Sequence, residues 1–231
     1  MIKAILWDVD GTLLDFEAQE EAAIRKCFEI FKLGECTDEM LKEYSSINAS
    51  YWPRMEKGEL TKQQVLVYRF VEFFEKHGID TSIAEKFNET YQEKLGETIR
   101  FMPNGREVVT NLKGKVIQCA ATNGTKVAAR KKLRLSMLDQ LFDHIFISEE
   151  VGFEKPRIEY YNVIFDTLKG IKPEEVLMVG DSLTSDIRGG NNAGIKTCFF
   201  NPERKPYTTD LRIDYEIVNL NEVLDVLLVN L

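Results

Sequence analysis

Residues 5–15 read ILWDVDGTLLD, an apolar run that ends in two acids, Asp8 and Asp10, before a glycine and a threonine. An uninterrupted apolar run is typical of a parallel strand that is covered on both faces. Residues two apart in an extended chain point to the same side, so both carboxylates are expected on one face. The simplest interpretation is an acidic turn after a buried strand, and the rest of the chain decides whether it holds.

Strand-like runs recur along the chain, and helical patterns separate them. The later runs occupy residues 115–123 (KVIQCAATN), 144–150 (HIFISEE), 175–181 (EVLMVGD), 196–201 (KTCFFN) and, more weakly, 215–219 (YEIVN). Helices are expected at 104–113, 125–138, 157–169, 184–193 and 221–229. Strands that alternate with helices predict an α/β fold, here a Rossmann-like parallel sheet with crossover helices.

Residues 16–96 break this rhythm, because they contain helical patterns and no convincing strand. Apolar residues recur at helical spacing, as in Ile24, Cys27, Phe28 and Phe31, and again in Val67, Phe70, Val71 and Phe74. The second of these helices, expected at about 61–76, follows a break and a cap in GELT. We therefore predict a core made of residues 1–15 and 97–231, with an inserted helical domain at 16–96.

The composition is that of an ordinary soluble protein and narrows the range of partners. The net charge is −8, from 30 basic and 38 acidic residues, which argues against a nucleic-acid polymer or an anionic membrane as partner. No segment approaches the roughly 18 uninterrupted apolar residues of a membrane span, and no signal peptide is expected. The four cysteines form no CxxC pair, so we expect thiols and a cytoplasmic location.

Residues that can carry chemistry follow four of the predicted strands. They are DVDGT at 8–12, TNG at 122–124, Lys155 in GFEKP, and GDS at 180–182 with Asp186 shortly after Asp181. Each of these features alone is more often structural than catalytic. In an open parallel sheet, however, ligands gather outside the carboxyl ends of the strands. Their shared position at one edge predicts a single site.

The acids of this edge require a cation. Two unit charges 4 Å apart repel by about 4 kcal/mol at an effective dielectric near 20, and four carboxylates are expected here: Asp8, Asp10, Asp181 and Asp186. Hard oxygen ligands with water select Mg²⁺, whereas a structural Ca²⁺ site would have a fuller protein shell. Since phosphate commonly accompanies Mg²⁺ held by few protein ligands, the site is predicted to bind a phosphoryl group.

The neighbouring residues suit that group. Thr122 offers a hydroxyl, and the backbone amides of Asn123 and Gly124 can point into the same pocket. Gly11 lets the backbone approach closely, and Lys155 supplies positive charge to a dianion that lies beside carboxylates. No usable arrangement of His, Cys or Ser is present, so a carboxylate is the expected nucleophile, as in aspartyl-phosphate chemistry.

Taken in order, DVDGT, TNG, GFEKP and GDSLTSD resemble the motifs of the haloacid dehalogenase-like hydrolases over nearly the whole chain. The resemblance implies that Asp8 attacks phosphorus, while Asp10 protonates the leaving oxygen and later activates water. It implies that Thr122 and Lys155 hold the phosphoryl oxygens.

The same resemblance implies a metal site and a role for the inserted helices. Mg²⁺ would be bound by Asp8, the main-chain carbonyl of Asp10, and Asp181, with Asp186 in support. Residues 16–96 would be the cap domain, which closes over the site and excludes water.

A narrower resemblance concerns the substrate. ISEEVGFEKP, VLMVGDSLTSDIRGGNNAG and, in the cap, WPRMEKGELTKQQVLVYRF look like the pyrimidine 5′-nucleotidase branch. This implies a small phosphorylated metabolite, a nucleoside 5′-monophosphate, as substrate. Trp52 and Arg54 are then candidate cap residues near the substrate. The alternative interpretation is an aromatic packed inside the cap and a solvated surface arginine.

Other functions stay open at this point. Asp10 argues against a dehalogenase, which needs no acid for an alkoxide. A sugar-phosphate phosphatase or a phosphomutase would share all four motifs. A phosphoacceptor signalling module also gathers acids and a lysine at strand ends, although such modules lack a helical insert after the first strand. We expect a monomer or a weak homo-oligomer.

Overall fold

A computed structural model of the protein describes residues 1–229. It contains a six-stranded sheet in the order β3-β2-β1-β4-β5-β6, in which every neighbouring pair is parallel. The strands are β1 (Ala4–Trp7), β2 (Ile117–Thr122), β3 (His144–Ile147), β4 (Val176–Gly180), β5 (Lys196–Phe200) and β6 (Tyr215–Ile217). All six lie within the ranges predicted from the sequence, and the predicted α/β fold class is confirmed.

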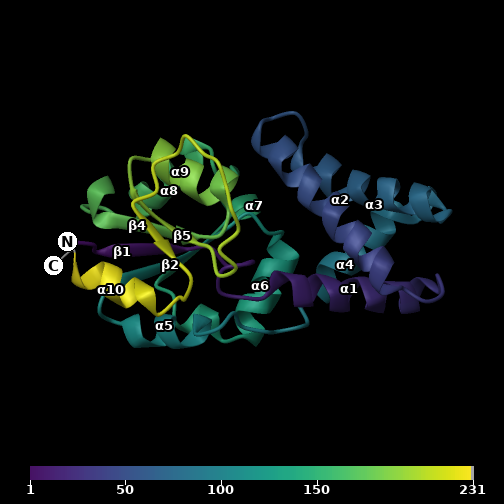
Figure 1. Ribbon diagram of the computed structural model, residues 1–231, viewed down its shortest axis with the longest axis horizontal. Helices are drawn as coiled ribbons and strands as arrows, with labels where there is room; N and C mark the ends of the chain where they lie inside the picture. The colour runs from purple at the N-terminus through teal and green to yellow at the C-terminus, as the bar shows by residue number, and fades with distance from the viewer. Residues whose placement is uncertain (230–231) are drawn as a thin grey trace.

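Helices cover both faces of this sheet (Figure 1). One face packs against α5 (Gly105–Leu112), α6 (Lys126–Leu135) and α10 (Glu222–Leu228). The other packs against α8 (Ile158–Thr167) and α9 (Arg188–Asn192). Both faces of the sheet are therefore dry, which explains why its strands read as continuous apolar runs rather than alternating ones.

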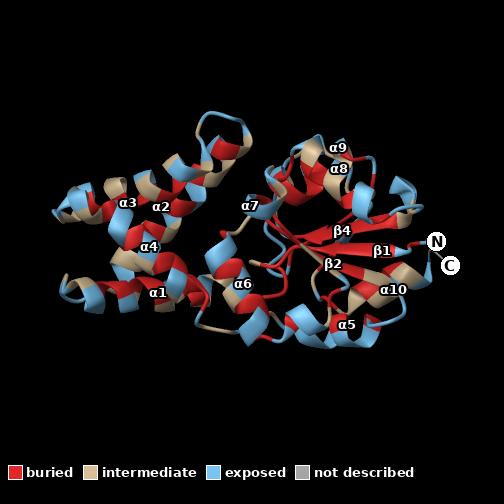
Figure 2. Ribbon diagram, turned by 180° about the vertical axis from the view of Figure 1, so that it is seen from behind, coloured by how far each residue is buried: buried red, intermediate tan, exposed pale blue. Residues whose placement is uncertain are grey.

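The helices of the insert lie beyond the carboxyl edge of the sheet and form a second apolar cluster (Figure 1, Figure 2). They are α1 (Phe16–Phe31), α2 (Asp38–Glu56), α3 (Lys62–His77) and α4 (Ala84–Leu95). Thr61 caps α3 in a capping box, and Gly78 ends it in the left-handed conformation. Because this cluster is separate from those of the sheet, we propose to treat residues 16–96 as a cap domain inserted into the core of residues 1–15 and 97–231.

Two segments differ from the sequence-based prediction. The strand expected at 144–150 ends at Ile147, and α7 (Ser148–Val151) begins at once, with Ser148 fully buried. The helix expected at 184–193 divides into a π-helical turn, Leu183–Ile187, and α9. Ser182 caps this turn, and its side chain accepts a hydrogen bond from the Ser185 amide, 3.1 Å away.

The remaining general predictions concern cysteines and membranes. All four cysteines are buried free thiols. Within residues 1–229, no helix has the length and apolar character that a membrane crossing requires.

Candidate active site

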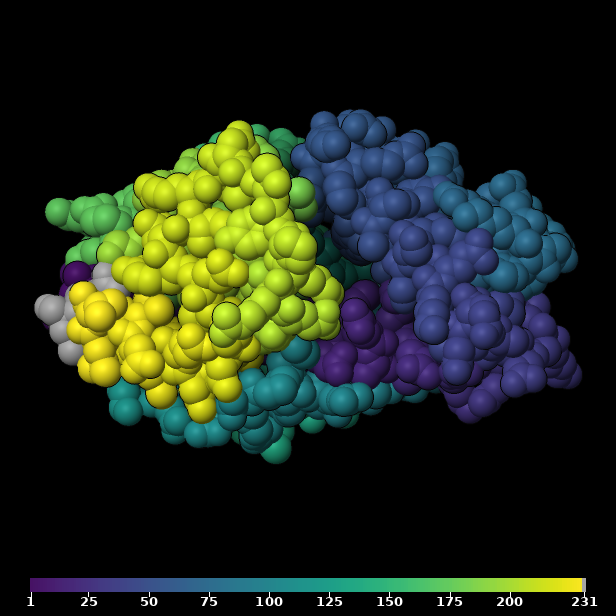
Figure 3. Space-filling model, viewed as in Figure 1, coloured from purple at the N-terminus to yellow at the C-terminus, as the bar shows by residue number. Residues whose placement is uncertain are grey.

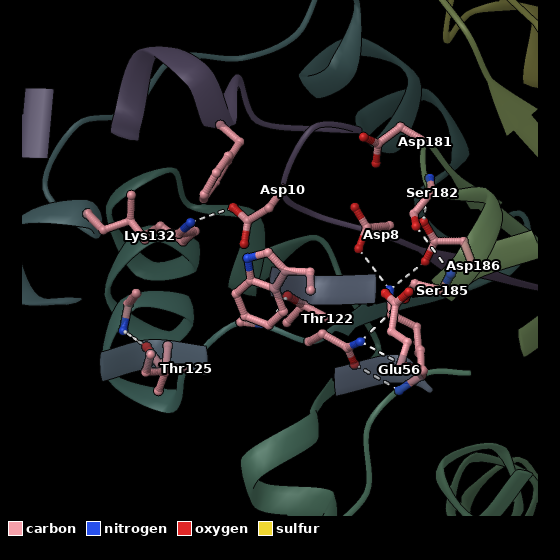
Figure 4. Close-up of a pocket in the computed structure, with 18 of the residues that line it drawn as sticks. Asp8, Asp10, Glu56, Thr122, Thr125, Lys132, Asp181, Ser182, Ser185 and Asp186 are labelled. Atoms are coloured by element: carbon pink, nitrogen blue, oxygen red, sulfur yellow. Dashed lines mark hydrogen bonds and ion pairs between the residues drawn. The ribbon is translucent and has the colours of Figure 1, made fainter. Parts of the chain in front are cut away.

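Asp8 directly follows β1 and lies at the carboxyl edge of the sheet (Figure 4). Its amide donates to the carbonyl of Val179 on β4 at 2.9 Å, which fixes the backbone between two central strands. Its Oδ2 accepts a hydrogen bond from Thr12 Oγ1 at 3.1 Å, and its side chain is almost fully buried. The first acid of the quoted motif is thus held rigidly by the sheet.

Lys155 is the cation that faces Asp8. Its Nζ donates to Asp8 Oδ1 at 2.8 Å, to Asp186 Oδ1 at 2.6 Å and to the carbonyl of Ala121 at 2.6 Å. These acceptors use all three N–H groups of the ammonium. Although burial lowers the pKa of Lys155, the charges of Asp186 and Asp8 raise it above its usual range. The lysine is therefore a fixed positive charge between two carboxylates.

Asp8, Asp181 and Asp186 form an acidic cluster, in which one oxygen from each lies within 4.8 Å of the others. Thr12 Oγ1 also donates to Asp181 Oδ1 at 3.0 Å, and Asp186 Oδ2 accepts from the Ser182 amide at 3.1 Å. The π-helical turn Leu183–Ile187 places Asp186 in this cluster. Such turns are frequent at functional sites.

The electrostatics of the cluster show that it is short of positive charge. Burial, and then the charge of Asp186, raise the pKa of Asp181 to about 7. Burial likewise raises the pKa of Asp8, against the lowering effect of Lys155. A hard divalent cation bound by carboxylate oxygens would relieve both penalties, so the donor set fits Mg²⁺.

The small residues of the site lie where a side chain would not fit. Gly11 has a φ of +91°, and a Cβ at this position would lie 2.5 Å from Asp181 Oδ2.

Thr122 is buried at the end of β2, and its Oγ1 accepts from the Gly124 amide at 2.9 Å. The Asn123 side chain accepts from the Lys155 amide and donates to the Lys155 carbonyl, both at 2.8 Å. Asn123 thus ties the loop that carries the lysine to β2.

Asp10 points away from Asp8 and toward Lys132 on α6 (Figure 4), so the acidic cluster contains three of the four expected carboxylates and not the side chain of Asp10. Lys132 is a residue that the sequence reasoning missed. The Lys132 Nζ donates to Asp10 Oδ1, and also to Gln19 Oε1 on α1 at 2.9 Å. Lys132 is only 1% exposed. A signal was present in the sequence, because residue 132 falls on the same helical face as Ala128, Ala129 and Leu133.

A cavity of about 210 Å³ joins these residues to the cap. The core supplies the acids, Lys155 and the Thr122–Gly124 turn, while the cap supplies Trp52, Leu66, Arg69, Gln92 and Leu95. The surface is hollowed where the cap meets the C-terminal half of the core (Figure 3). Trp52 therefore lies at the cavity, as proposed from the sequence. Arg54 is not in its lining and instead pairs with Glu59 at 3.6 Å.

One cap residue brings a further carboxylate to the cavity. Glu56, at the end of α2, points toward Ser185 and Asp186 (Figure 4). Its Oε2 is buried and has no hydrogen-bond partner among the described residues. Burial raises the pKa of Glu56 to about 7, against a hydrogen bond from Thr184 that lowers it.

Comparison with known proteins agrees with this geometry. The sequence profile of the haloacid dehalogenase-like hydrolases matches residues 5–200. A Bacillus subtilis (strain 168) protein named as a HAD-hydrolase, YfnB, is 35% identical over 225 residues, 97% of this chain and 95% of that protein. A crystal structure of YfnB bound to magnesium, which reveals interdomain movement in that protein, aligns with a TM-score of 0.91 and covers 98% of both chains.

Two further relatives carry names that state a substrate. The pyrimidine 5′-nucleotidase PynA of Streptococcus pneumoniae is 32% identical, over 97% of this chain and 94% of its own. The glyceraldehyde 3-phosphate phosphatase of Pyrococcus furiosus is 29% identical, over 98% of this chain and 93% of its own. The motifs, the fold and these matches agree, and the chain belongs to the haloacid dehalogenase-like hydrolases.

Proposed function

We propose that the protein is a Mg²⁺-dependent phosphomonoesterase of the cytoplasm that forms an aspartyl-phosphate on Asp8, with nucleoside 5′-monophosphates as substrates. The observation that supports this most is the environment of Asp8. It is a buried carboxylate on a rigid strand end, with Lys155 on one oxygen and two further acids within reach of a shared cation. Once it holds a divalent cation, such a site would offset the charge of an incoming phosphoryl dianion.

In the proposed reaction, an Asp8 oxygen attacks phosphorus and the bond from phosphorus to the leaving oxygen breaks. Asp10 gives its proton to that oxygen, so the product leaves as an alcohol. Asp10 then takes a proton from a water molecule, whose oxygen attacks the same phosphorus and releases Asp8 with inorganic phosphate. The Thr122 hydroxyl and the Asn123 amide would hold the equatorial oxygens, and the Gly124 amide would join them by giving up its hydrogen bond to Thr122 Oγ1.

Asp8, Asp181, the Asp10 carbonyl and, in support, Asp186 would hold the Mg²⁺. The cation would supply positive charge to the phosphoryl oxygens. Lys155 would complement the charge of the cation, because two of its N–H groups already bind Asp8 and Asp186. In this scheme the lysine orients and neutralises the nucleophile before substrate arrives.

The cap side of the cavity supports a nucleotide rather than a triose phosphate. Trp52, Leu66 and Leu95 present apolar surface, which a flat base can cover and a small polyol cannot. The similarity to PynA supports the same choice. A sugar-phosphate phosphatase is the second candidate, since the similarity to the Pyrococcus furiosus enzyme covers almost the whole chain.

The experiment that tests the chemistry measures inorganic phosphate released from a panel of nucleotides and sugar phosphates. We expect turnover that is lost in EDTA, returns with Mg²⁺, and falls at least about a thousandfold in Asp8→Asn, which removes the nucleophile.

Thermal unfolding of Asp8→Asn serves as the control that the fold survives. Full activity in the folded Asp8→Asn variant would contradict the mechanism. Faster release from sugar phosphates than from nucleotides would favour the second candidate and leave the mechanism standing. Isomer interconversion without phosphate release would instead indicate a mutase.

A further inference from the structure

Arg69 is a buried cation in the wall of the active-site cavity, on the cap helix α3. Its side chain is 1% exposed. Its guanidinium donates to Asn48 Oδ1 at 2.6 Å, to Asn88 Oδ1 at 3.3 Å and to the carbonyl of Leu66 at 3.4 Å. All three acceptors are neutral, and the guanidinium also packs over the rings of Phe70 and Tyr91, at 5.0 and 5.1 Å from their centroids. No carboxylate among the described residues forms an ion pair with this buried charge.

The guanidinium still has donors to offer. It carries five N–H groups, and the hydrogen bonds within the described residues use one from Nε and one from each terminal nitrogen. Each terminal nitrogen therefore retains an N–H. Because Arg69 lines the cavity, these groups are available to a ligand that enters it.

The surroundings of Arg69 are locked by hydrogen bonds. Asn48 accepts from both Arg69 and the indole N–H of Trp52, the latter at 3.0 Å. Gln92 donates to Asn88 Oδ1 at 3.1 Å and accepts from Thr125 Oγ1 of the core at 2.8 Å. With its N–H already used, the Trp52 indole offers the cavity only apolar surface. A cavity wall whose side chains are held in place in this way is typical of a site that recognises a ligand.

The charge balance indicates which ligand fits. Asn48 Nδ2 donates to Glu20 Oε1 at 2.6 Å, so the Asn48 side-chain amide connects the Arg69 guanidinium to the buried carboxylate of Glu20. Glu56 brings a further acid to the same cavity. These carboxylates offset the charge of Arg69 and disfavour an anionic group at this end. A neutral acceptor, such as a ring carbonyl, meets the free N–H groups without adding negative charge.

We infer that Arg69, held by Asn48 and Asn88, donates hydrogen bonds to a carbonyl of a flat heterocyclic ring lying between Trp52 and Leu66, and so selects nucleotides over phosphate esters that lack such a ring. The inference rests on the proposed phosphatase function and names the residues that recognise its leaving group.

The test compares uridine 5′-monophosphate with ribose 5-phosphate, which lacks the base, in the wild type, Arg69→Met and Arg69→Lys. We expect the wild type to prefer the nucleotide in kcat/KM. Arg69→Met should reduce that preference about 10- to 100-fold, the value of a hydrogen bond from a charged donor, with the change mainly in KM. Arg69→Lys should retain only part of the wild-type preference, because lysine keeps the positive charge but lacks the planar, paired N–H donors of a guanidinium.

Arg25→Met is the matched control, since Arg25 is an exposed cap arginine that pairs with Glu21 and Asp38, and it should keep the wild-type ratio. Equal turnover of both substrates by the wild type would overturn the inference even if Arg69→Met failed to fold. A wild-type preference that survives in Arg69→Met would assign Arg69 to cap packing and overturn the inference alone. Absence of any Asp8-dependent phosphate release would overturn the proposed function and the inference with it.

Discussion

Lys155 of the core and Arg69 of the cap are both buried cations at the same cavity, and their charges are balanced in different ways. Lys155 lies directly between Asp8, which follows β1, and Asp186, which lies in the π-helical turn after β4. Within residues 1–229, the hydrogen-bond partners of Arg69 are all neutral groups on helices, and the Asn48 amide lies between Arg69 and Glu20. A directly paired charge in the core suits chemistry on charged groups. A charge balanced at a distance in the cap keeps donors free for a neutral ligand.

The largest expected effect comes from removing the core cation. Lys155→Met leaves two carboxylates buried without their partner, so in EDTA the free energy of unfolding should fall by about 3–5 kcal/mol. Mg²⁺ should restore part of this loss, because a cation that binds only the folded state stabilises it. Thermal unfolding of wild type and variant, with and without Mg²⁺, measures both effects.

Arg69→Met provides the matched comparison, because it removes the buried cation of the cap. Its stability loss should be smaller and the same with and without Mg²⁺, since Arg69 does not contact the acidic cluster. If Mg²⁺ failed to recover any stability in Lys155→Met, the acids would not be a cation site.

A second prediction concerns Lys132, which joins the core acid Asp10 to Gln19 of the cap. We expect Lys132→Met to lower kcat about 10- to 100-fold with little change in KM, because Asp10 loses the group that orients it. Lys132→Arg should recover part of the rate. Steady-state kinetics with an aryl phosphate, which needs no base recognition, measures this directly.

Its neighbour Lys131 is the control, since it lies on the same helix and pairs with exposed Glu97 at 2.9 Å. Lys131→Met should keep the wild-type kcat. An equal fall in both variants would show that helix stability, and not the orientation of Asp10, sets the rate.

The smallest effect is expected from Glu56, and it depends on pH. Burial raises the pKa of this carboxyl from 4.5 to about 7, so the folded protein favours its protonated form. The contribution of this group to the free energy of unfolding is fully present below pH 4.5 and is lost as the pH rises toward 7. Glu56→Gln, which cannot ionise, should therefore be more stable than wild type by about 1–3 kcal/mol at pH 8.

The difference should disappear near pH 4, where both side chains are neutral, and denaturant unfolding at both pH values measures it. Glu59→Gln, measured at the same two pH values, is the control, because that side chain is 51% exposed. A Glu56→Gln variant that is less stable at pH 8 would contradict the assigned pKa.

The site residues of the core are predictable from the sequence because they follow strand ends. A strand is recognised locally, and parallel strands bring their carboxyl ends to one edge, so the amino-acid sequence alone is enough to group DVDGT, TNG, Lys155 and Asp181. Even here the sequence-based prediction is incomplete. Thr12, which donates to both Asp8 and Asp181, lies inside the quoted motif, and its spacing gave no reason to assign it a role.

The cap could not be predicted in the same way. Whether a helical residue lines a cavity depends on its rotation and on three neighbouring helices, and none of these is a local property. Arg54 and Arg69 are both cap arginines, yet only Arg69 lines the cavity. Position 69 lies three and four residues from Leu66, Val65 and Phe73 on the buried face of α3, and a charge on that face was the available signal.

The chain enters and leaves the helical insert at one place. The Asp15 amide donates to the Arg100 carbonyl at 2.9 Å, and Leu14 forms an antiparallel bridge with Phe101. The two connections are thus joined side by side, and no strand of the sheet is interrupted between them. A chimaera that exchanges residues 16–99 for the corresponding segment of a relative would therefore cut no strand, so substrate choice could be transplanted while the chemical centre stays in its own sheet.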